Sequence, residues 1–108
     1  MKYVLHYQSS TRSDLERWVS SQPGSEPERR ALAKECLNAL RAYLIEHRGT
    51  PPEAIPVRDL EPPNYWLVFG KGWWMKYCVE IHRRWFCPAI GQITILAIQN
   101  ESPDREIS

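Results

Sequence analysis

Residues 65–81 of the chain read YWLVFGKGWWMKYCVEI, and this stretch decides the fold. An apolar run ends at Phe69, and the closely spaced glycines in Gly70-Lys71-Gly72 are typical of a tight hairpin turn. Beyond the turn, apolar side chains at odd positions alternate with a more mixed set that includes Lys76 and Glu80. A period of two indicates a strand with one buried and one partly wet face. The stretch therefore predicts two antiparallel strands joined by a turn.

Upstream of this hairpin, the pattern predicts one strand and two helices. Residues 2–8 alternate with a period of two and predict a strand. Two capping boxes, each a serine followed three residues later by a glutamate, predict helices that start at Ser13 and Ser25. We expect the first helix to end near Ser21 and the second to end at about His47. The apolar residues of the second helix recur every three or four positions: Leu32, Cys36, Leu37, Leu40, Tyr43 and Leu44.

The remaining segments complete the expected topology. A proline-rich connection at residues 50–64 favours an extended strap, and a polar and aromatic segment occupies residues 82–92. The apolar run at residues 93–98 predicts a central strand, and the charged residues 99–108 predict a frayed tail. The order β-α-α-β-β-β predicts a single α+β domain over residues 1–108. We expect its two N-terminal helices to pack on one face of a mostly antiparallel four-stranded sheet.

The composition is that of an ordinary globular domain. Lys and Arg number 14 against 13 Asp and Glu, which gives a formal net charge of +1, and 43% of the 108 residues are hydrophobic. The charge balance argues against a histone-like polycation, and the apolar content argues against a disordered chain. The three cysteines form an odd set, and no apolar run approaches the roughly 20 residues that cross a bilayer. The N-terminal residues also do not resemble a signal peptide. Together, the odd number of cysteines, the lack of a long apolar run and this N-terminus predict a cytoplasmic protein.

Residue types that hold metals or act as nucleophiles are poorly arranged. Cys78, His82 and Cys87 lie close in sequence, but no second ligand pair accompanies them, as a zinc site requires. Gly70-Lys71-Gly72 has no helix after it, as a phosphate-binding loop would. We therefore expect no metal and no cofactor, and we expect Cys36 and Cys78 to be buried as small apolar side chains.

Cations and aromatic rings are interleaved on and beside the hairpin. The cationic side chains are those of Lys71, Lys76, His82, Arg83 and Arg84. The aromatic ones are four tryptophans, Trp66, Trp73, Trp74 and Trp85. Bases stack on aromatic rings while cations neutralise phosphates, so the pattern indicates a nucleic-acid-binding surface. A plainer alternative stays open, in which the tryptophans belong to the core and residues 82–84 form a solvated rim.

Residues 72–79, Gly-Trp-Trp-Met-Lys-Tyr-Cys-Val, look like a run of glycine, aromatic, arginine, two hydrophobic residues, tyrosine and a hydrophobic residue. That run is found in the RelE/ParE superfamily of bacterial toxins, which the layout of residues 2–100 resembles as a whole. Residues 93–98 resemble the last core strand of the family, and Leu60 lies where the family has a leucine before its second strand.

The resemblance implies a toxin of a type II toxin–antitoxin module, with a cognate antitoxin protein as its partner. It also implies a target, which is either the ribosome with its mRNA or a DNA-handling enzyme. In the ribonuclease branch the arginine after the aromatic residue binds the scissile phosphate, but Trp74 stands there in this chain. The cation that usually follows the last strand is replaced by Gln99-Asn100. Because charge stabilisation of this kind contributes several kcal/mol, non-catalytic inhibition stands beside mRNA cleavage as the expected mode.

Under the resemblance, the candidate catalytic residues of an mRNA endoribonuclease are the remaining cations, Lys76, His82, Arg83 and Arg84. The candidate nucleic-acid-binding residues are Lys71, Trp73, Trp74 and Trp85. An alternative of another class is a non-enzymatic adaptor with the same fold, which binds a protein partner through the tryptophan-rich hairpin face.

Overall fold

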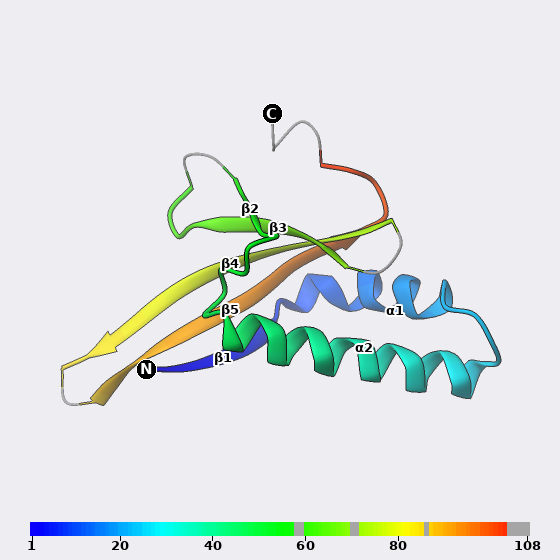
Figure 1. The fold of residues 1–108 in the computed structure, drawn as a ribbon, viewed down its shortest axis with the longest axis horizontal. Coiled ribbons are helices and arrows are strands. Elements are labelled where there is room, and N and C mark those ends of the chain that lie inside the picture. Colours follow the sequence, from blue (N-terminus) through cyan, green and yellow to red (C-terminus); the bar gives the residue numbers. More distant parts are fainter. Residues whose placement is uncertain (58–59, 70–71, 86, 104–108) are drawn as a thin grey trace.

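Two helices cover one face of a five-stranded sheet, so the protein has two layers (Figure 1). The computed structural model describes residues 1–57, 60–69, 72–85 and 87–103, with only the backbone at positions 84 and 87. The strands are β1 (Lys2–Tyr7), β2 (Ile55–Pro56), β3 (Asn64–Phe69), β4 (Trp73–Arg84) and β5 (Cys87–Gln99). The helices are α1 (Arg12–Ser20) and α2 (Glu26–Glu46), and a short 3-10 turn (Ser9–Thr11) precedes α1.

The strand order is β1-β5-β4-β3-β2, with β1 parallel to β5 and every other pair antiparallel. The predicted α+β class and helix placement are confirmed, but the sheet is five-stranded and mixed, not four-stranded. The additional strand comes from the proline-rich connection, where Ile55 pairs with Trp66 and Pro56 with Tyr65 of β3. Proline lacks a backbone donor, and an edge strand such as β2 tolerates it.

Neither predicted capping box forms. α1 begins at Arg12, so Ser13 lies inside the helix. The residue before α1 is Thr11, whose buried hydroxyl donates to the Gln8 carbonyl oxygen at 2.6 Å. Ser25 does precede α2, but its side chain makes no capping hydrogen bond. Pro27 in the first turn of α2 helps to start that helix instead, because its fixed φ already suits it.

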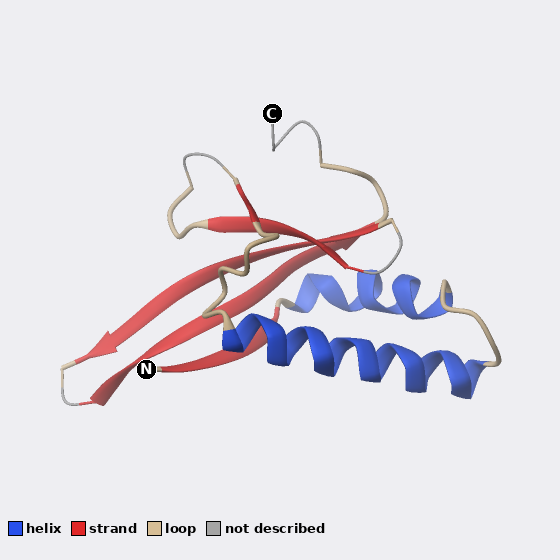
Figure 2. Ribbon diagram, in the orientation of Figure 1, coloured by secondary structure: helices blue, strands red, loops and turns tan. Residues whose placement is uncertain are grey.

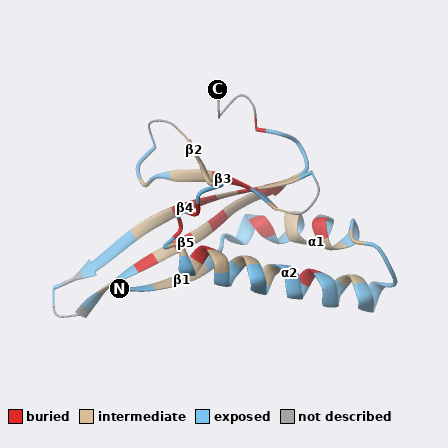
Figure 3. Cartoon of the chain, in the orientation of Figure 1, coloured by how far each residue is buried: buried red, intermediate tan, exposed pale blue. Residues whose placement is uncertain are grey.

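The core-facing side of α2 is narrower than the sequence predicts. Ala33 and Leu44 are buried, and Leu37 and Leu40 pack against the core. Leu32 remains 43% exposed, and Cys36 is also exposed, which contradicts the expectation that this thiol is buried. Leu32 and Cys36 each precede a core residue by one position, a rotation of about 100° around the helix axis. The outward side of α2 is correspondingly exposed (Figure 3).

A bulge in β5 keeps its isoleucines in the core. Lys76 of β4 pairs with Ala97, whereas the next residue, Tyr77, pairs with Ile95. The chain therefore has one additional residue on β5 at this point, which shifts the alternation of side chains. As a result, Ile95 and Ile98 both face the helices and are fully buried although they are three positions apart.

The β4–β5 hairpin is longer than predicted. Strand pairing continues past Ile81 through His82 with Ile90 and as far as residues 84 and 87, forming an arm that extends beyond the helices (Figure 2). The apolar pattern fades in this region, but backbone pairing does not require apolar side chains. Of the predicted frayed tail, Gln99 belongs to β5 and Pro103 is buried, while residues 104–108 lie outside the described part of the chain.

A buried hydrogen bond joins the end of α2 to the middle of β4. The Tyr77 hydroxyl donates to the Gly49 carbonyl oxygen at 2.8 Å, and Tyr77 is fully buried. Burial raises the pKa of this phenol, so it remains a donor at physiological pH. Gly49 closes α2 with φ of 79° and donates its N–H to the Leu44 carbonyl oxygen at 2.8 Å. A side chain at Gly49 would meet Val79, since a Cβ there lies 2.7 Å from its Cγ2.

Gly49→Ala is expected to lower the free energy of unfolding by about 3 kcal/mol, because it adds a steric clash to an unfavourable φ. Gly72→Ala is the matched control, since Gly72 has a similar φ of 75° with nothing within 4 Å of an added Cβ. The free energy of unfolding of this control should fall by only about 1 kcal/mol. Urea denaturation of both variants measures the difference, and equal losses would show that contact with Val79 is unimportant.

Candidate nucleic-acid interface

The sheet face turned away from the helices carries several of the predicted site residues. Met75 and Tyr77 of β4 are fully buried beneath the helices, so the even-numbered residues beside them point to the opposite face. Strand pairing extends this alternation across the sheet, because His6 of β1 lies opposite Thr94 of β5, which lies opposite Cys78 of β4. We call this side of the sheet the outer face.

A groove of about 610 Å³ crosses the outer face at the base of the β4–β5 arm. Its lining residues are His6, His82, Arg83, Gln92, Val4, Pro88 and Ile90. The described lining includes three side chains that can carry positive charge and no acidic one. We call this feature the histidine groove.

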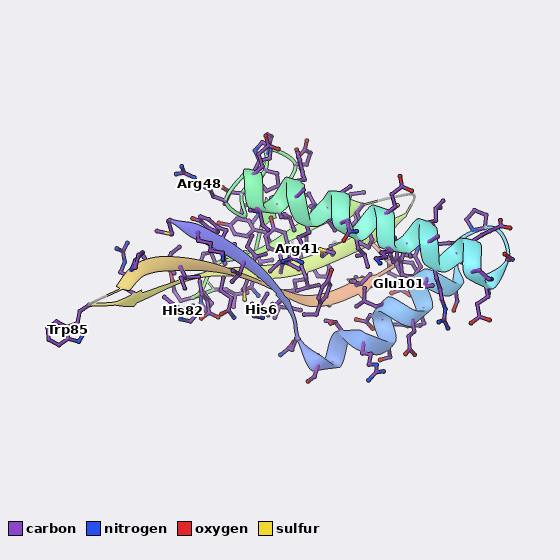
Figure 4. The ribbon with its side chains drawn as sticks, turned by 90° about the horizontal axis from the view of Figure 1, so that it is seen from below. His6, Arg41, Arg48, His82, Trp85 and Glu101 are labelled. Atoms are coloured by element: carbon purple, nitrogen blue, oxygen red, sulfur yellow. The ribbon has the colours of Figure 1, made fainter. Side chains whose placement is uncertain are left out.

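The histidine groove brings together residues from β1, β4 and β5. His82 and Arg83 were predicted from the sequence as neighbours in a basic run, and both line it. His6 was not predicted as a site residue. In the sequence, the alternation of residues 2–8 shows only that His6 lies on the opposite face of that strand from Tyr3 and Leu5. No local pattern shows which strand pairs with residues 2–8, so the neighbours of His6 could not be predicted. Figure 4 labels His6 and His82 on the same side of the sheet ribbons.

His82 has an acidic neighbour at the rim of the groove. Its Nε2 atom lies 3.7 Å from Oε2 of Glu80, and both side chains are about half exposed. An exposed pair of this kind contributes little to stability, but it restricts the orientations of the imidazole. Glu80 also lies beside Cys78, and burial together with this carboxylate raises the pKa of the Cys78 thiol. The thiol therefore stays protonated and is a poor nucleophile.

The two histidines are too far apart for concerted action on one phosphate. His6 pairs with Thr94 and His82 with Ile90, so they are two strands and four residues apart. Standard sheet spacings put their Cα atoms roughly 16 Å apart. A general acid and a general base must each come within about 3 Å of the reacting atoms. The spacing suits contacts to different phosphates of one strand.

Lys76, the remaining described candidate catalytic cation, lies outside the histidine groove. It is six residues from His82 on β4, which corresponds to roughly 20 Å along the strand. Its ammonium group lies 5.6 Å from the ring centroid of Trp66, which is 3% exposed. The structure therefore places this cation over a buried aromatic ring, away from His82 and Arg83.

The predicted aromatic residues are distributed over three places. Trp85 is 98% exposed at the tip of the β4–β5 arm (Figure 4). Trp74 is half-buried on the outer face, where it pairs with Val68. Trp73 pairs with Phe69 on the helix side, so it does not share a surface with Trp85. Two further predicted residues are not described as side chains: Lys71 lies outside the described residues, and at Arg84 only the backbone is described.

A larger groove, of about 750 Å³, lies on the other side of the protein between the helices and the end of the β3–β4 hairpin. We call it the apolar groove, and its lining residues are Trp18, Ser21, Gln22, Pro23, Cys36, Ala39, Leu40, Tyr43, Phe69 and Trp73. The rings of Trp18 and Phe69 are among its lining, with centroids 5.3 Å apart. Because no lining residue carries a formal charge at neutral pH, this larger groove is a poorer phosphate site than the histidine groove.

The described residues contain no group of three or more His, Cys, Asp or Glu side chains placed to hold a metal ion. Within the same residues, no helix is both long and apolar enough to cross a membrane. No protein-family model, no curated protein and no solved structure matches this chain. The candidate interface therefore depends on the residues and their geometry.

Trp85→Phe is expected to remove more of the iodide-quenchable tryptophan emission than any other single tryptophan substitution, because Trp85 is 98% exposed. Trp66→Phe is the control, since Trp66 is 3% exposed and iodide reaches it poorly. Steady-state quenching of both variants measures the effect. If quenching of Trp85→Phe equals that of the wild-type protein, the tip of the arm is not open to solvent.

Proposed function

We propose that the protein is a RelE/ParE-like toxin of a type II toxin–antitoxin module, and that it inhibits growth by binding RNA at the ribosome. The proposal draws its family from the resemblance of residues 72–79 and from the element order. The proposed mode of action, RNA binding, depends on the histidine groove, and this groove is the main observation in favour of the proposal. A cytoplasmic location and an antitoxin partner are parts of the same proposal.

The histidine groove suits an RNA strand in three respects. It lies on a sheet face that the helices leave uncovered, so a polymer has access to it. Arg83 offers charge and hydrogen-bond donors at one end, beside the imidazole of His82, and His6 places a second imidazole at the other end. The ring of Trp85, which is 98% exposed at the tip of the adjoining arm, is of a type that can stack on a base.

Binding without cleavage fits the spacing of these groups better than ribonuclease action. Cleavage of a phosphodiester requires an acid, a base and a cation around one phosphate. Here strand spacing puts the Cα atoms of His6 and His82 roughly 16 Å apart, and it puts Lys76 about 20 Å along β4 from His82. Trp74 also stands where the resembled ribonucleases have an arginine. We therefore assign His82 and Arg83 to RNA binding, with no catalytic role.

Induced expression in a bacterial host is expected to arrest growth while cellular transcripts stay intact. A His82→Ala/Arg83→Ala double variant should relieve the arrest, because it removes both donors at one end of the groove. Growth curves measure the arrest, and primer extension on abundant mRNAs measures transcript integrity. Cut transcripts in the wild-type culture would replace binding with cleavage as the mode of action.

The matched control is Arg12→Ala/His47→Ala, which removes one guanidinium and one imidazole from positions outside the histidine groove. Thermal melting of both double variants should show that each is folded at the growth temperature. If the control relieves the arrest as fully as the groove variant, the groove is not the site of action. If the wild-type chain does not slow growth at all, the toxin proposal is wrong.

The apolar groove favours a second candidate function, that of a non-enzymatic adaptor for a protein partner. Trp73, one of the predicted binding residues, lies in this groove beside Phe69 and Trp18. Aromatic side chains in a desolvated pocket are typical of the centre of a protein interface. An adaptor of this kind would bind its partner with little dependence on salt concentration.

The dye 1-anilinonaphthalene-8-sulfonate is expected to bind in the apolar groove, and Cys36→Glu should weaken that binding by about tenfold or more. The added carboxylate would lie in an apolar wall and repel the sulfonate. Cys36→Ser is the matched control, with nearly the same size and no charge. Fluorescence titration measures both affinities, and equal affinities for the two variants would mean that the dye binds elsewhere.

A further inference from the structure

A second cationic surface lies along α2, on the other side of β1 from the histidine groove. At 3.6 residues per turn, the side chains of Arg30, Lys34 and Arg41 fall within about 40° of one another around the helix axis. Beyond the first turn of α2, its acidic residues are Glu35 and Glu46. These two fall roughly 100–160° away from the cations. Beyond its first turn, α2 therefore carries its positive and negative side chains on different sides.

The positive side of α2 forms a depression with β1. Its polar lining residues are Tyr7, Arg30, Lys34, Asn38 and Arg41, and we call this set the α2 depression. Its volume is about 310 Å³, and its lining contains no acidic residue. A site of this size lies at the small end of the range for ligand pockets.

Two of the three cations in the α2 depression are available to an anion. Arg30 is paired with Glu26 at 2.8 Å, although both side chains are largely exposed. Among the described residues, neither Lys34 nor Arg41 has a carboxylate within salt-bridge distance. An arginine fork can grip a phosphate with two hydrogen bonds, and a lysine adds a point charge beside it.

Tyr7 provides an aromatic ring at the edge of the same depression. Its side chain is 41% exposed at the end of β1. Partial burial raises the pKa of its phenol, and the nearby Arg41 guanidinium opposes that shift. The phenol therefore stays protonated and can donate a hydrogen bond, while its exposed ring can stack on a base.

We propose that the α2 depression binds one or two nucleotides of single-stranded RNA, with Lys34 and Arg41 on the phosphate and Tyr7 stacked on a base. Asn38 supplies an amide beside them that can hydrogen-bond to a base edge or to the ribose. Single-stranded nucleic acid is favoured over an acidic protein because the lining combines an aromatic ring with phosphate-binding cations.

The inference rests on the proposed function for its choice of RNA, and it gives that function a second contact. β1 is one of the two edge strands of the sheet, with His6 on the outer face and its neighbour Tyr7 turned to α2. Figure 4 labels His6 and Arg41 near β1. A strand that leaves the histidine groove past His6 can therefore pass round the sheet edge and enter the α2 depression.

The test is binding of a fluorescein-labelled oligouridine of about 12 nucleotides, measured by anisotropy over a range of salt concentrations. Arg41→Glu is expected to weaken binding by about tenfold or more. Arg12→Glu is the matched control, because it makes the same charge change at a well-exposed position on α1. It should weaken binding by less than about twofold. Equal effects of the two substitutions would overturn the proposal.

Salt dependence and the ring of Tyr7 give two further measurements. A Lys34→Ala/Arg41→Ala double variant should lower the slope of log affinity against log salt by about 0.7, since the two cations share one phosphate and each phosphate neutralised in a single strand contributes about 0.7. Tyr7→Ala should weaken binding by about fivefold or more, and Tyr7→Phe should retain most of it. A salt slope that is unchanged in the double variant would show that these cations do not contact phosphates.

The His82→Ala/Arg83→Ala protein in the same assay separates this proposal from the proposed function. Loss of affinity in Arg41→Glu alone supports the α2 depression and removes the histidine groove from RNA binding. Loss in the groove variant alone overturns the α2 depression and leaves the proposed function standing. A labelled polyglutamate peptide that binds as tightly as the RNA, and depends equally on Arg41, would reassign this surface to an acidic protein.

Discussion

The pairing of β5 with two neighbours of opposite direction is the constraint on which the rest of the structure depends. β5 runs parallel to β1 and antiparallel to β4. A parallel neighbour cannot be reached by a tight turn, so the chain must cross over between β1 and the strands that follow. α1 and α2 lie within that crossover and cover one face of the sheet. Asp14 of α1 fixes the arrangement by accepting a hydrogen bond from the Ile98 N–H at 3.1 Å.

The same pairing determines what each surface of the protein offers. β5 places His6 of β1 and His82 of β4 on one uncovered face, and it sets the distance between them. β1 becomes the sheet edge, with its outer-face side chains at the histidine groove and Tyr7 at the α2 depression. The apolar groove lies apart from both, beside the β3–β4 hairpin. Charge and apolar surface are therefore separated in space although the net charge is only +1.

Much of the fold was predictable because its signals are local. The alternation in residues 65–81 predicted β3 and most of β4, and the apolar run at 93–98 predicted the middle of β5. The strand at Ile55–Pro56 was missed because two residues, one of them proline, carry no periodic pattern. The site was predicted in part, since His82 and Arg83 are neighbours in sequence. His6 joins them through parallel pairing with a distant strand, which no spacing rule reports.

The sequence by itself determined the α+β class, the two helices and the hairpin, because hydrophobic periodicity and turn residues act over a few positions. Only the tertiary structure decided which cations and tryptophans share a surface. Trp73 and Trp74 are adjacent in sequence, yet alternation along β4 sends the first to the helix side and the second to the outer face. Arg41 and Tyr7 are far apart in sequence, yet packing of α2 on β1 makes them neighbours. Such proximities depend on strand order and on the bulge in β5, which are properties of the whole chain.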